Sequence, residues 1–239
     1  MKGTRHDIFA QTRWTLIRRA AGSDTAAREA LAGLCGTYWQ PLYAYLRKTG
    51  RTPPDAEDLT QGFFERLLRL DSLATVRREE GKFRAFLLAS LKHYLADQHD
   101  MAHAQKRDVR LTIPLDGGNA ETRYLTVPAD ALTPDQMFER QWAITLLERV
   151  MRRLAVEYDA AGKGELFAEL RFAIAGEKSA VPYSELSARI GMSEEAVRVA
   201  VHRLRQRYRT ALREELAQTV SSEEEVLEEL RYLRRILSR

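Results

Sequence analysis

The chain has 239 residues, of which 30% are charged, and a formal net charge of +4 at pH 7. Because this balance is mild, nucleic-acid binding has to be inferred from where the basic side chains lie. The single cysteine, Cys35, excludes an intramolecular disulfide framework and suits a reducing compartment. No apolar run approaches the length of a membrane span, and the charged start MKGTRHD lacks an adjoining signal-peptide core. We therefore expect a soluble, cytoplasmic protein without membrane insertion.

Long amphipathic segments with few glycines and prolines predict an all-α chain. The segment 109–132 is different, because it holds the only Gly-Gly pair, two prolines and a β-branched alternation that could form a small hairpin near Asp116. We predict a helical domain over 1–108, a flexible linker over 109–132, a second helical domain over 133–220 and an amphipathic helical extension over 221–239.

In the first domain, the segment DAEDLTQGFFERLLRL predicts a helix over residues 55–70 that begins at Asp55. Its apolar residues form two adjacent stripes, which are Leu59, Phe63, Leu67 and Leu70 on one side and Phe64 and Leu68 on the other. An apolar arc of this width indicates either a helix packed on two sides within its own domain or a helix whose second side meets a partner protein.

The next predicted helix runs from about Phe83 to Arg107, and basic residues alternate with alanines on its outer side. Small residues between basic ones permit the close approach of another helix or of a sugar-phosphate backbone. His99 and His103 lie four residues apart and could contribute to a metal site, but no HExxH motif or second His/carboxylate motif accompanies them. We therefore predict neither a metal nor a cofactor.

The segment YSELSARIGMSEEAVRVAVHRLRQRYR, residues 183–209, predicts two helices separated by a turn at Gly191. Ser193 stands at the N-cap position of the second helix, and Glu194 and Glu195 follow in its first turn, where acidic groups interact favourably with the helix dipole. This order is typical of a helix-turn-helix, whose second helix enters the DNA major groove. A charged surface helix of an α-bundle is the alternative.

The second helix of this pair has two different faces. An apolar arc comprises Val197, Ala200, Val201, Leu204, Tyr208 and Ala211. The opposite arc carries Glu195, Val199, His202 and Gln206, flanked by Arg198, Arg203 and Arg209. A solvated helix has no reason to place Val199 on its outer face, whereas a DNA-reading helix can pack it on a thymine methyl group.

In the extension, Val226, Leu230, Leu233 and Leu237 follow a/d spacing, with acidic residues early and arginines late. The segment is short for an independent coiled coil. We expect it to dock on its own domain, on a neighbouring chain or on a regulator.

Two stretches together resemble a known family. DAEDLTQGFFERLL followed by GKFRAFLLASLKHYLADQHDMAHAQKR resembles domain two of bacterial sigma factors of the extracytoplasmic-function (ECF) type, and PYSELSARIGMSEEAVRVAVHRLRQRYRTAL resembles their domain four. The order, the spacing and the linker match over nearly all of residues 26–220. The resemblance implies a non-enzymatic initiation factor that binds core RNA polymerase and promoter DNA, with an anti-sigma factor or other regulator as a further partner.

The resemblance also implies three groups of site residues. The clamp helices of the polymerase's largest subunit would meet Asp58, Gln61, Phe64 and Glu65. The opened downstream promoter element would meet Arg77, Arg78, Lys92, His93, Gln98, Lys106 and Arg107. The upstream element would be read as duplex by Ser193, Glu195, Arg198, Val199, His202, Arg203, Arg205 and Arg209. In this third group, Val199 and His202 would face the bases and the arginines would mostly hold phosphates.

Two other functions stay open. A helix-turn-helix repressor or activator would bind duplex DNA by itself, as a dimer formed through the heptads of 226–237. A metal-dependent helical hydrolase would use His99, His103, Glu57 and Asp58. The sequence contains no phosphate-binding G-x-x-x-x-G-K-[ST] loop, G-x-S-x-G elbow or Cys/His nucleophile pair, which favours a protein without catalytic activity.

Overall fold

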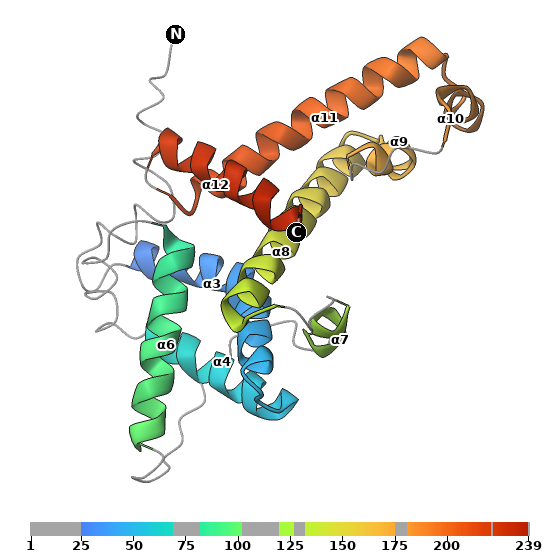
Figure 1. The fold of residues 1–239 in the computed structure, drawn as a ribbon. Coiled ribbons are helices and arrows are strands. Elements are labelled where there is room, and N and C mark those ends of the chain that lie inside the picture. Colours follow the sequence, from blue (N-terminus) through green and yellow to red (C-terminus); the bar gives the residue numbers. More distant parts are fainter. Residues whose placement is uncertain are drawn as a thin grey trace. The chain divides into compact units, whose positions relative to one another are not determined.

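The computed structural model describes residues 25–68, 82–101, 120–126, 132–174, 181–220 and 222–238. Every regular element in these ranges is a helix (Figure 1). In chain order they are α3 (Thr25–Lys48), α4 (Pro53–Leu68), α6 (Phe83–Met101), α7 (Ala120–Leu125), α8 (Pro134–Ala160), α9 (Gly164–Leu170), the short 3₁₀ helix η2 (Arg171–Ala173), α10 (Tyr183–Ile190), α11 (Glu194–Ala217) and α12 (Glu223–Leu237). The all-α prediction is confirmed.

The chain divides into two compact units, which we describe separately. Unit 1 comprises residues 1–145 and 216–239, and unit 2 comprises residues 146–215. The boundaries fall inside α8 and α11, so each of these helices contributes residues to both units. The functional domains expected on either side of 109–132 remain a prediction, because the compact units divide the chain at other positions.

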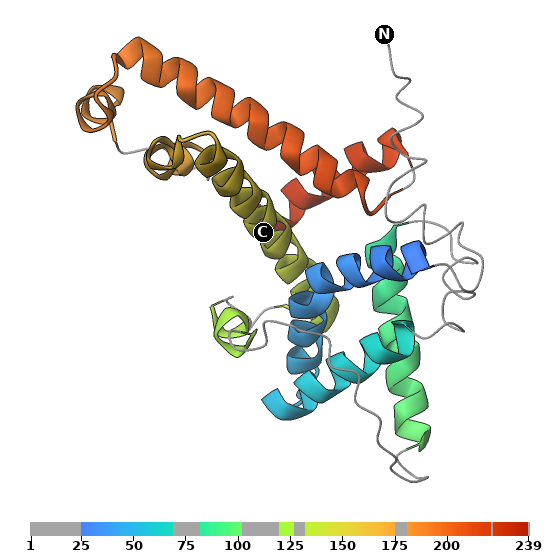
Figure 2. The same cartoon turned by 180° about the vertical axis from the view of Figure 1, so that it is seen from behind.

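Helices α3, α4 and α6 lie together in unit 1 (Figure 2). The side chains that they bury include many aromatic rings. Tyr38 of α3 meets Phe83 of α6 edge-on, with ring centroids 5.1 Å apart. Trp39 of α3 stacks on Phe64 of α4 at 6.1 Å. Burial of such large rings contributes strongly to stability, since each removes a large apolar area from water.

Helix α4 begins two residues earlier than predicted, because its N-cap is Thr52 rather than Asp55. The Thr52 hydroxyl accepts a hydrogen bond from the Asp55 N–H (3.3 Å) and donates one to the Asp55 carboxylate (2.7 Å). The wide apolar arc of α4 is explained within unit 1, since Phe64 faces Trp39 and Phe63 lies 5.8 Å from the ring of Tyr94 in α6. The helix is therefore packed on two sides by its own unit.

The segment expected to be a linker contains a helix, α7, that is tied to α3. The Tyr43 hydroxyl donates a hydrogen bond to the Glu121 carboxylate at 2.6 Å, and Arg47 donates two more to it at 2.7 and 2.8 Å. The Arg47 guanidinium holds the pKa of the Glu121 carboxyl below its ordinary value. The strand-like alternation was therefore misleading for residues 120–125, whereas the expected hairpin centre at 116–118 lies outside the residues that the structure describes.

The C-terminal extension forms α12 and docks within unit 1, which was one of three expected arrangements. Ser222 is its N-cap and accepts a hydrogen bond from the Glu225 N–H at 3.2 Å. The predicted register is wrong at the end of the helix, because Leu237 is 43% exposed. The residues that α12 buries are Val226, Glu229, Leu233 and Ile236.

We predict that Glu121→Gln lowers the free energy of unfolding by about 2 kcal/mol at pH 7, because two hydrogen bonds from the Arg47 guanidinium lose their charged acceptor. The folded-state pKa of Glu121 is lowered, so its contribution is present above the ordinary pKa of about 4.3 and is lost as the pH falls through the folded-state value. Urea unfolding at pH 7 and at pH 3 should therefore show a difference that shrinks in acid.

The exposed acid of α4, Asp58, provides the control for this prediction. Asp58→Asn should change the unfolding free energy little at either pH. An equal loss for both variants, or a loss for Glu121→Gln that does not depend on pH, would contradict the proposed clamp between α3 and α7.

Candidate nucleic-acid interface

Helices α10 and α11 of unit 2 form the predicted helix pair with a tight turn. Gly191 ends α10 in the left-handed conformation, at φ +71°, and its N–H donates to the Ser187 carbonyl oxygen at 2.9 Å. Glycine suits this position because a Cβ atom disfavours positive φ. Ser193 caps α11, since its hydroxyl accepts a hydrogen bond from the Ala196 N–H at 3.2 Å. The predicted turn and cap are confirmed.

One face of α11 is held inside unit 2. Val197, Val201, Leu204 and Ala211 are buried, with side chains at most 1% exposed. These residues recur at spacings of three, four and seven, so a single stripe of the helix packs inward. The opposite side of the first four turns is left for contact with solvent or a ligand.

All eight residues predicted to read duplex DNA lie on the exposed side of this helix or at its cap. Val199 is 43% exposed, so its side chain is available to a ligand. Two of the arginines have contacts within unit 2. Arg205 donates from Nε to the Ala173 carbonyl oxygen at 3.0 Å, and the Arg198 guanidinium lies 5.9 Å from the Tyr183 ring centroid.

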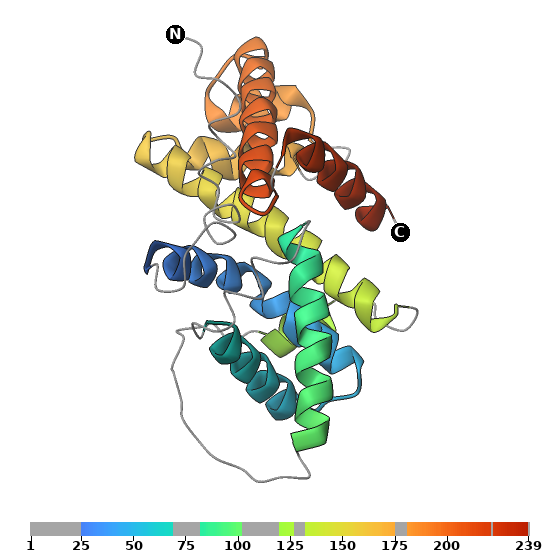
Figure 3. The ribbon, with the colours of Figure 1, turned by 90° about the vertical axis from the view of Figure 1, so that its left-hand side faces the viewer.

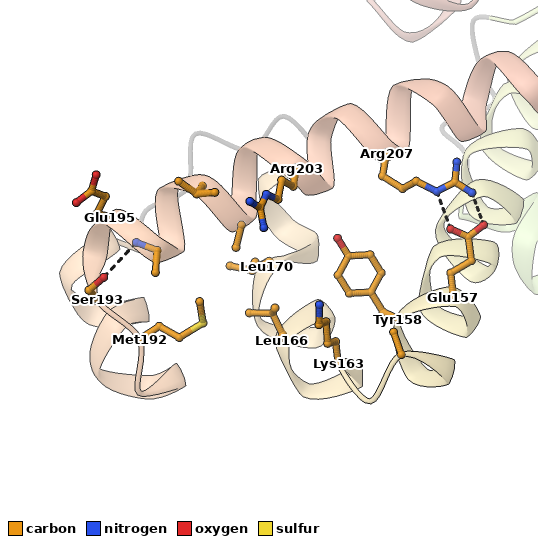
Figure 4. Close-up of a pocket in the computed structure, with 14 residues that line it drawn as sticks. Glu157, Tyr158, Lys163, Leu166, Leu170, Met192, Ser193, Glu195, Arg203 and Arg207 are labelled. Atoms are coloured by element: carbon orange, nitrogen blue, oxygen red, sulfur yellow. Dashed lines mark hydrogen bonds and ion pairs between the residues drawn. The ribbon is translucent and has the colours of Figure 1, made fainter. Parts of the chain in front are cut away.

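A groove of about 920 Å³ lies beside this helix, between α11, the end of α8 and α9 (Figure 4). Glu195, Val199 and Arg203, at four-residue intervals on α11, form one wall. Lys163 and Arg203 extend their charged ends into the space (Figure 4). The remaining lining residues are Glu157, Tyr158, Ala161, Leu166, Leu170, Met192, Ser193, Ala196, Ala200 and Arg207. Val199 is thus exposed on the outer face of α11 and also contributes to the groove wall.

An ion pair between α8 and α11 lines one end of the groove (Figure 4). Arg207 donates two hydrogen bonds to the Glu157 carboxylate, at 2.6 and 2.7 Å. The Arg207 guanidinium lowers the pKa of the Glu157 carboxyl, and Arg153 reinforces this effect from the preceding turn of α8. No pattern in the sequence singles out Glu157 or Arg207. Their charges are visible in the sequence, but nothing there indicates that these two helices face each other.

The downstream-element residues are only partly within the residues that the structure describes. Lys92 and His93 are exposed on α6, and Gln98 is half-buried. Lys92 has an acidic neighbour that the sequence did not indicate, because its Nζ lies 2.7 Å from the Asp135 carboxylate in the first turn of α8. The ribbon in Figure 3 shows α6 beside the first turns of α8. Arg77, Arg78, Lys106 and Arg107 lie outside those residues.

The expected polymerase-binding residues of α4 separate into two kinds. Asp58 is exposed, and Gln61 donates a hydrogen bond to Glu65 at 3.1 Å along the helix surface. The prediction that Phe64 contacts polymerase needs correction. Its side chain is fully buried against Trp39 and is unavailable to a partner in this structure. Its position in the second apolar stripe reflects internal packing.

Among the described residues, no three His, Cys, Asp or Glu side chains are placed to hold a metal ion. His103 and the side chain of His99 are not among them. Burial raises the pKa of the Cys35 thiol, which makes it a poor nucleophile. Within the same ranges, no helix is both long and apolar enough to cross a bilayer.

Comparison with known proteins finds a distant similarity to an ECF RNA polymerase sigma factor. The chain is 29% identical over 189 residues to the ECF RNA polymerase sigma factor SigF of Caulobacter vibrioides (strain NA1000 / CB15N). The match covers 79% of this chain and 87% of that protein, so it includes parts of both helical regions. No family model and no solved structure gives a significant match. The similarity supports the family relationship that the sequence motifs predicted.

We predict opposite effects on stability for two glycine substitutions. Gly191→Ala should destabilise the protein by about 1 kcal/mol, because alanine is strained in the left-handed region. Gly36→Ala should stabilise it by about 0.5–1 kcal/mol, because Gly36 is exposed within helix α3 and an added Cβ would meet no atom within 4 Å. Urea unfolding measures both. Equal signs for the two changes would contradict the assignment of Gly191 as an obligatory turn residue.

Proposed function

We propose that this chain is a transcription initiation factor that binds core RNA polymerase and directs it to specific promoters. In this proposal α11 reads an upstream promoter element as duplex, and the segment containing α6 holds a downstream element as opened single strand. The observation that carries the proposal is the similarity to an ECF sigma factor across both helical regions. The exposed basic side of the helix-turn-helix supports it independently.

The upstream readout would divide between bases and phosphates. Val199 and His202 are exposed on α11 and short enough to approach base edges, where each good contact is worth about 1–3 kcal/mol of discrimination. Arg198, Arg203 and Arg209 would contact phosphates, whose contribution falls steeply with salt. Arg205 would serve less as a phosphate contact than the sequence suggested, because its Nε is engaged by the Ala173 carbonyl.

The downstream readout would use Lys92 and His93, which are exposed on α6, and Gln98, which is half-buried within two turns of them. Opened strands are bound by basic grooves and by pockets for unstacked bases. The Lys92–Asp135 pair does not prevent such a role. Both side chains are about half exposed, at 44% and 50%, and exposed pairs of this kind contribute little stability, so a phosphate can replace Asp135 at small cost.

Core polymerase would be bound through the polar side of α4, formed by Asp58, Gln61 and Glu65. The reaction itself would belong to the polymerase, and this chain would need neither cofactor nor metal. A factor of this kind works in the cytoplasm, where polymerase and promoter meet. An anti-sigma factor or other regulator remains a predicted further partner.

A repressor or activator that dimerises through its C-terminal heptads is less well supported. Val226 and Leu233, which would form the dimer contact, are buried inside unit 1 at 1% and 4% exposure. Such a dimer would have to pull α12 away from its own unit. The sigma-factor proposal needs no rearrangement of this helix.

We predict that His202→Ala changes which promoters are used, whereas Arg209→Ala weakens binding to all of them. His202 would contact base edges, and its loss should cost about 1–3 kcal/mol only where its preferred base is present. Arg209 would contact a phosphate, so its loss should reduce the slope of log affinity against log salt by about one. Run-off transcription over a promoter panel, with binding measured at several salt concentrations, gives both quantities. Equal effects of the two changes on every promoter would contradict this division.

We further predict that Asp58→Lys weakens binding to core polymerase about tenfold or more, because a contact residue of the α4 polar face reverses its charge. Glu29→Lys is the matched control, since Glu29 is exposed on α3 outside the proposed surface. Native gel shift or sedimentation with purified core polymerase measures both. Unchanged binding by Asp58→Lys, or an equal loss for Glu29→Lys, would exclude α4 as the specific contact.

A further inference from the structure

The first turn of α6 is held by an arginine in the interior of unit 1. Arg84 is the second residue of α6, and its side chain is only 11% exposed. Its guanidinium pairs with Glu229 of α12, at 3.1 Å from Nη2 and 3.3 Å from Nε, and with Glu139 of α8 at 3.3 Å. One side chain therefore joins three helices.

Two aromatic rings complete the environment of this guanidinium. The Arg84 Cζ atom lies 4.8 Å from the ring centroid of Trp142 in α8 and 4.4 Å from that of Tyr232 in α12. Such distances allow attraction between the cation and the ring faces. Burial alone would lower the pKa of Arg84, but the nearby Glu229 carboxylate more than offsets this and the pKa is raised. The arginine is charged and enclosed, so it does not reach a nucleic acid.

Glu229 occupies a core position of α12. Its side chain is 1% exposed and lies on the same face as Val226, Leu233 and Ile236. Lys82, just before α6, also contacts it at 3.1 Å. A buried carboxylate is tolerated only when its charge is compensated, so α12 can dock stably only where Arg84 and Lys82 are presented together. The ion pair therefore specifies where α12 binds.

A backbone hydrogen bond also connects the start of α6 to the segment that precedes α12. The Phe83 N–H, at the first residue of α6, donates to the Thr219 carbonyl oxygen at 3.1 Å. The first N–H groups of a helix have no partner within the helix, so this bond satisfies one of them from the segment that leads into α12. The first two residues of α6 are thus both bonded to the segment 219–232, Phe83 through its backbone N–H and Arg84 through its side chain.

We infer that α12 is a positioning element for promoter opening, which fixes the amino end of α6 through the contact between Arg84 and Glu229. The inference rests on the proposed function, in which α6 holds the opened strand. Lys92 and His93 follow Arg84 by about two helical turns, so the direction of α6 at its start determines where they project. Arg84 is a positioning residue, because it acts through α6 and does not contact DNA.

Three variants and a control test this inference. Arg84→Met and Glu229→Leu each leave a buried charge without its main partner, whereas the double variant replaces the pair by apolar side chains of similar size. The control is Arg231→Gln, at an exposed position of α12. All are measured as full chains, by hydrogen exchange of the free protein, by core-polymerase binding and by permanganate reactivity of thymines in the promoter.

Each single variant should speed hydrogen exchange in α12 and in the first turns of α6 and lower promoter opening about tenfold, with core binding unchanged. The double variant should restore slow exchange and opening together, because α12 docks again. Arg231→Gln should behave as the unmodified protein. A merely structural role would instead lower core binding and opening in parallel, or would leave opening unrestored in the double variant, and either result overturns the inference.

Two further results would distinguish a failure of this inference from a failure of the proposed function. Normal opening by Glu229→Leu in spite of faster exchange would overturn the inference and leave the proposed function intact. Failure of the unmodified chain to bind core polymerase would overturn the proposed function and, with it, this role of α12.

Discussion

The pairing of Arg84 with Glu229 is the constraint on which the organisation of unit 1 depends. A guanidinium that is only 11% exposed must be compensated, and its partners come from α8 and α12, far away in the sequence. Trp142 and Tyr232 enclose it, so that electrostatics and packing require the same arrangement. For this reason the last residues of the chain belong to the same compact unit as α3, α4 and α6.

The distribution of charge explains how a chain of modest net charge can present a basic surface. Many arginines are neutralised inside the units, as Arg47 is by Glu121, Arg84 by Glu229 and Arg207 by Glu157. The arginines on the exposed side of α11, in contrast, are at the protein surface. In the proposed role the recognition helix would not need to be highly basic, because polymerase and the downstream element would share the binding energy. A repressor that acts alone would need the same helix to supply all of its specific binding energy.

Features governed by local rules were predictable from the sequence. The end of α10 at Gly191 and the cap at Ser193 depend on a few neighbouring residues, and the inward face of α11 follows from helical periodicity. Features that depend on distant partners were not predictable. The burial of Phe64 requires Trp39 of another helix, the helix at 120–125 requires Tyr43 and Arg47, and Glu229 at a core position requires Arg84. In α12, the a/d spacing assigned Leu237 to the apolar stripe, but this residue is exposed. The groove beside Val199 likewise arises from α8 and α9, and no pattern within α11 indicates it.

We propose that promoter choice arises from this chain only in complex with core polymerase. The most direct measurement is to supplement core polymerase with the purified chain, transcribe a library of genomic fragments and sequence the transcript starts. We expect transcript starts that share two sequence elements at a fixed spacing and that are absent with core polymerase alone. No new starts, together with tight and specific binding of duplex DNA by the chain without polymerase, would contradict it.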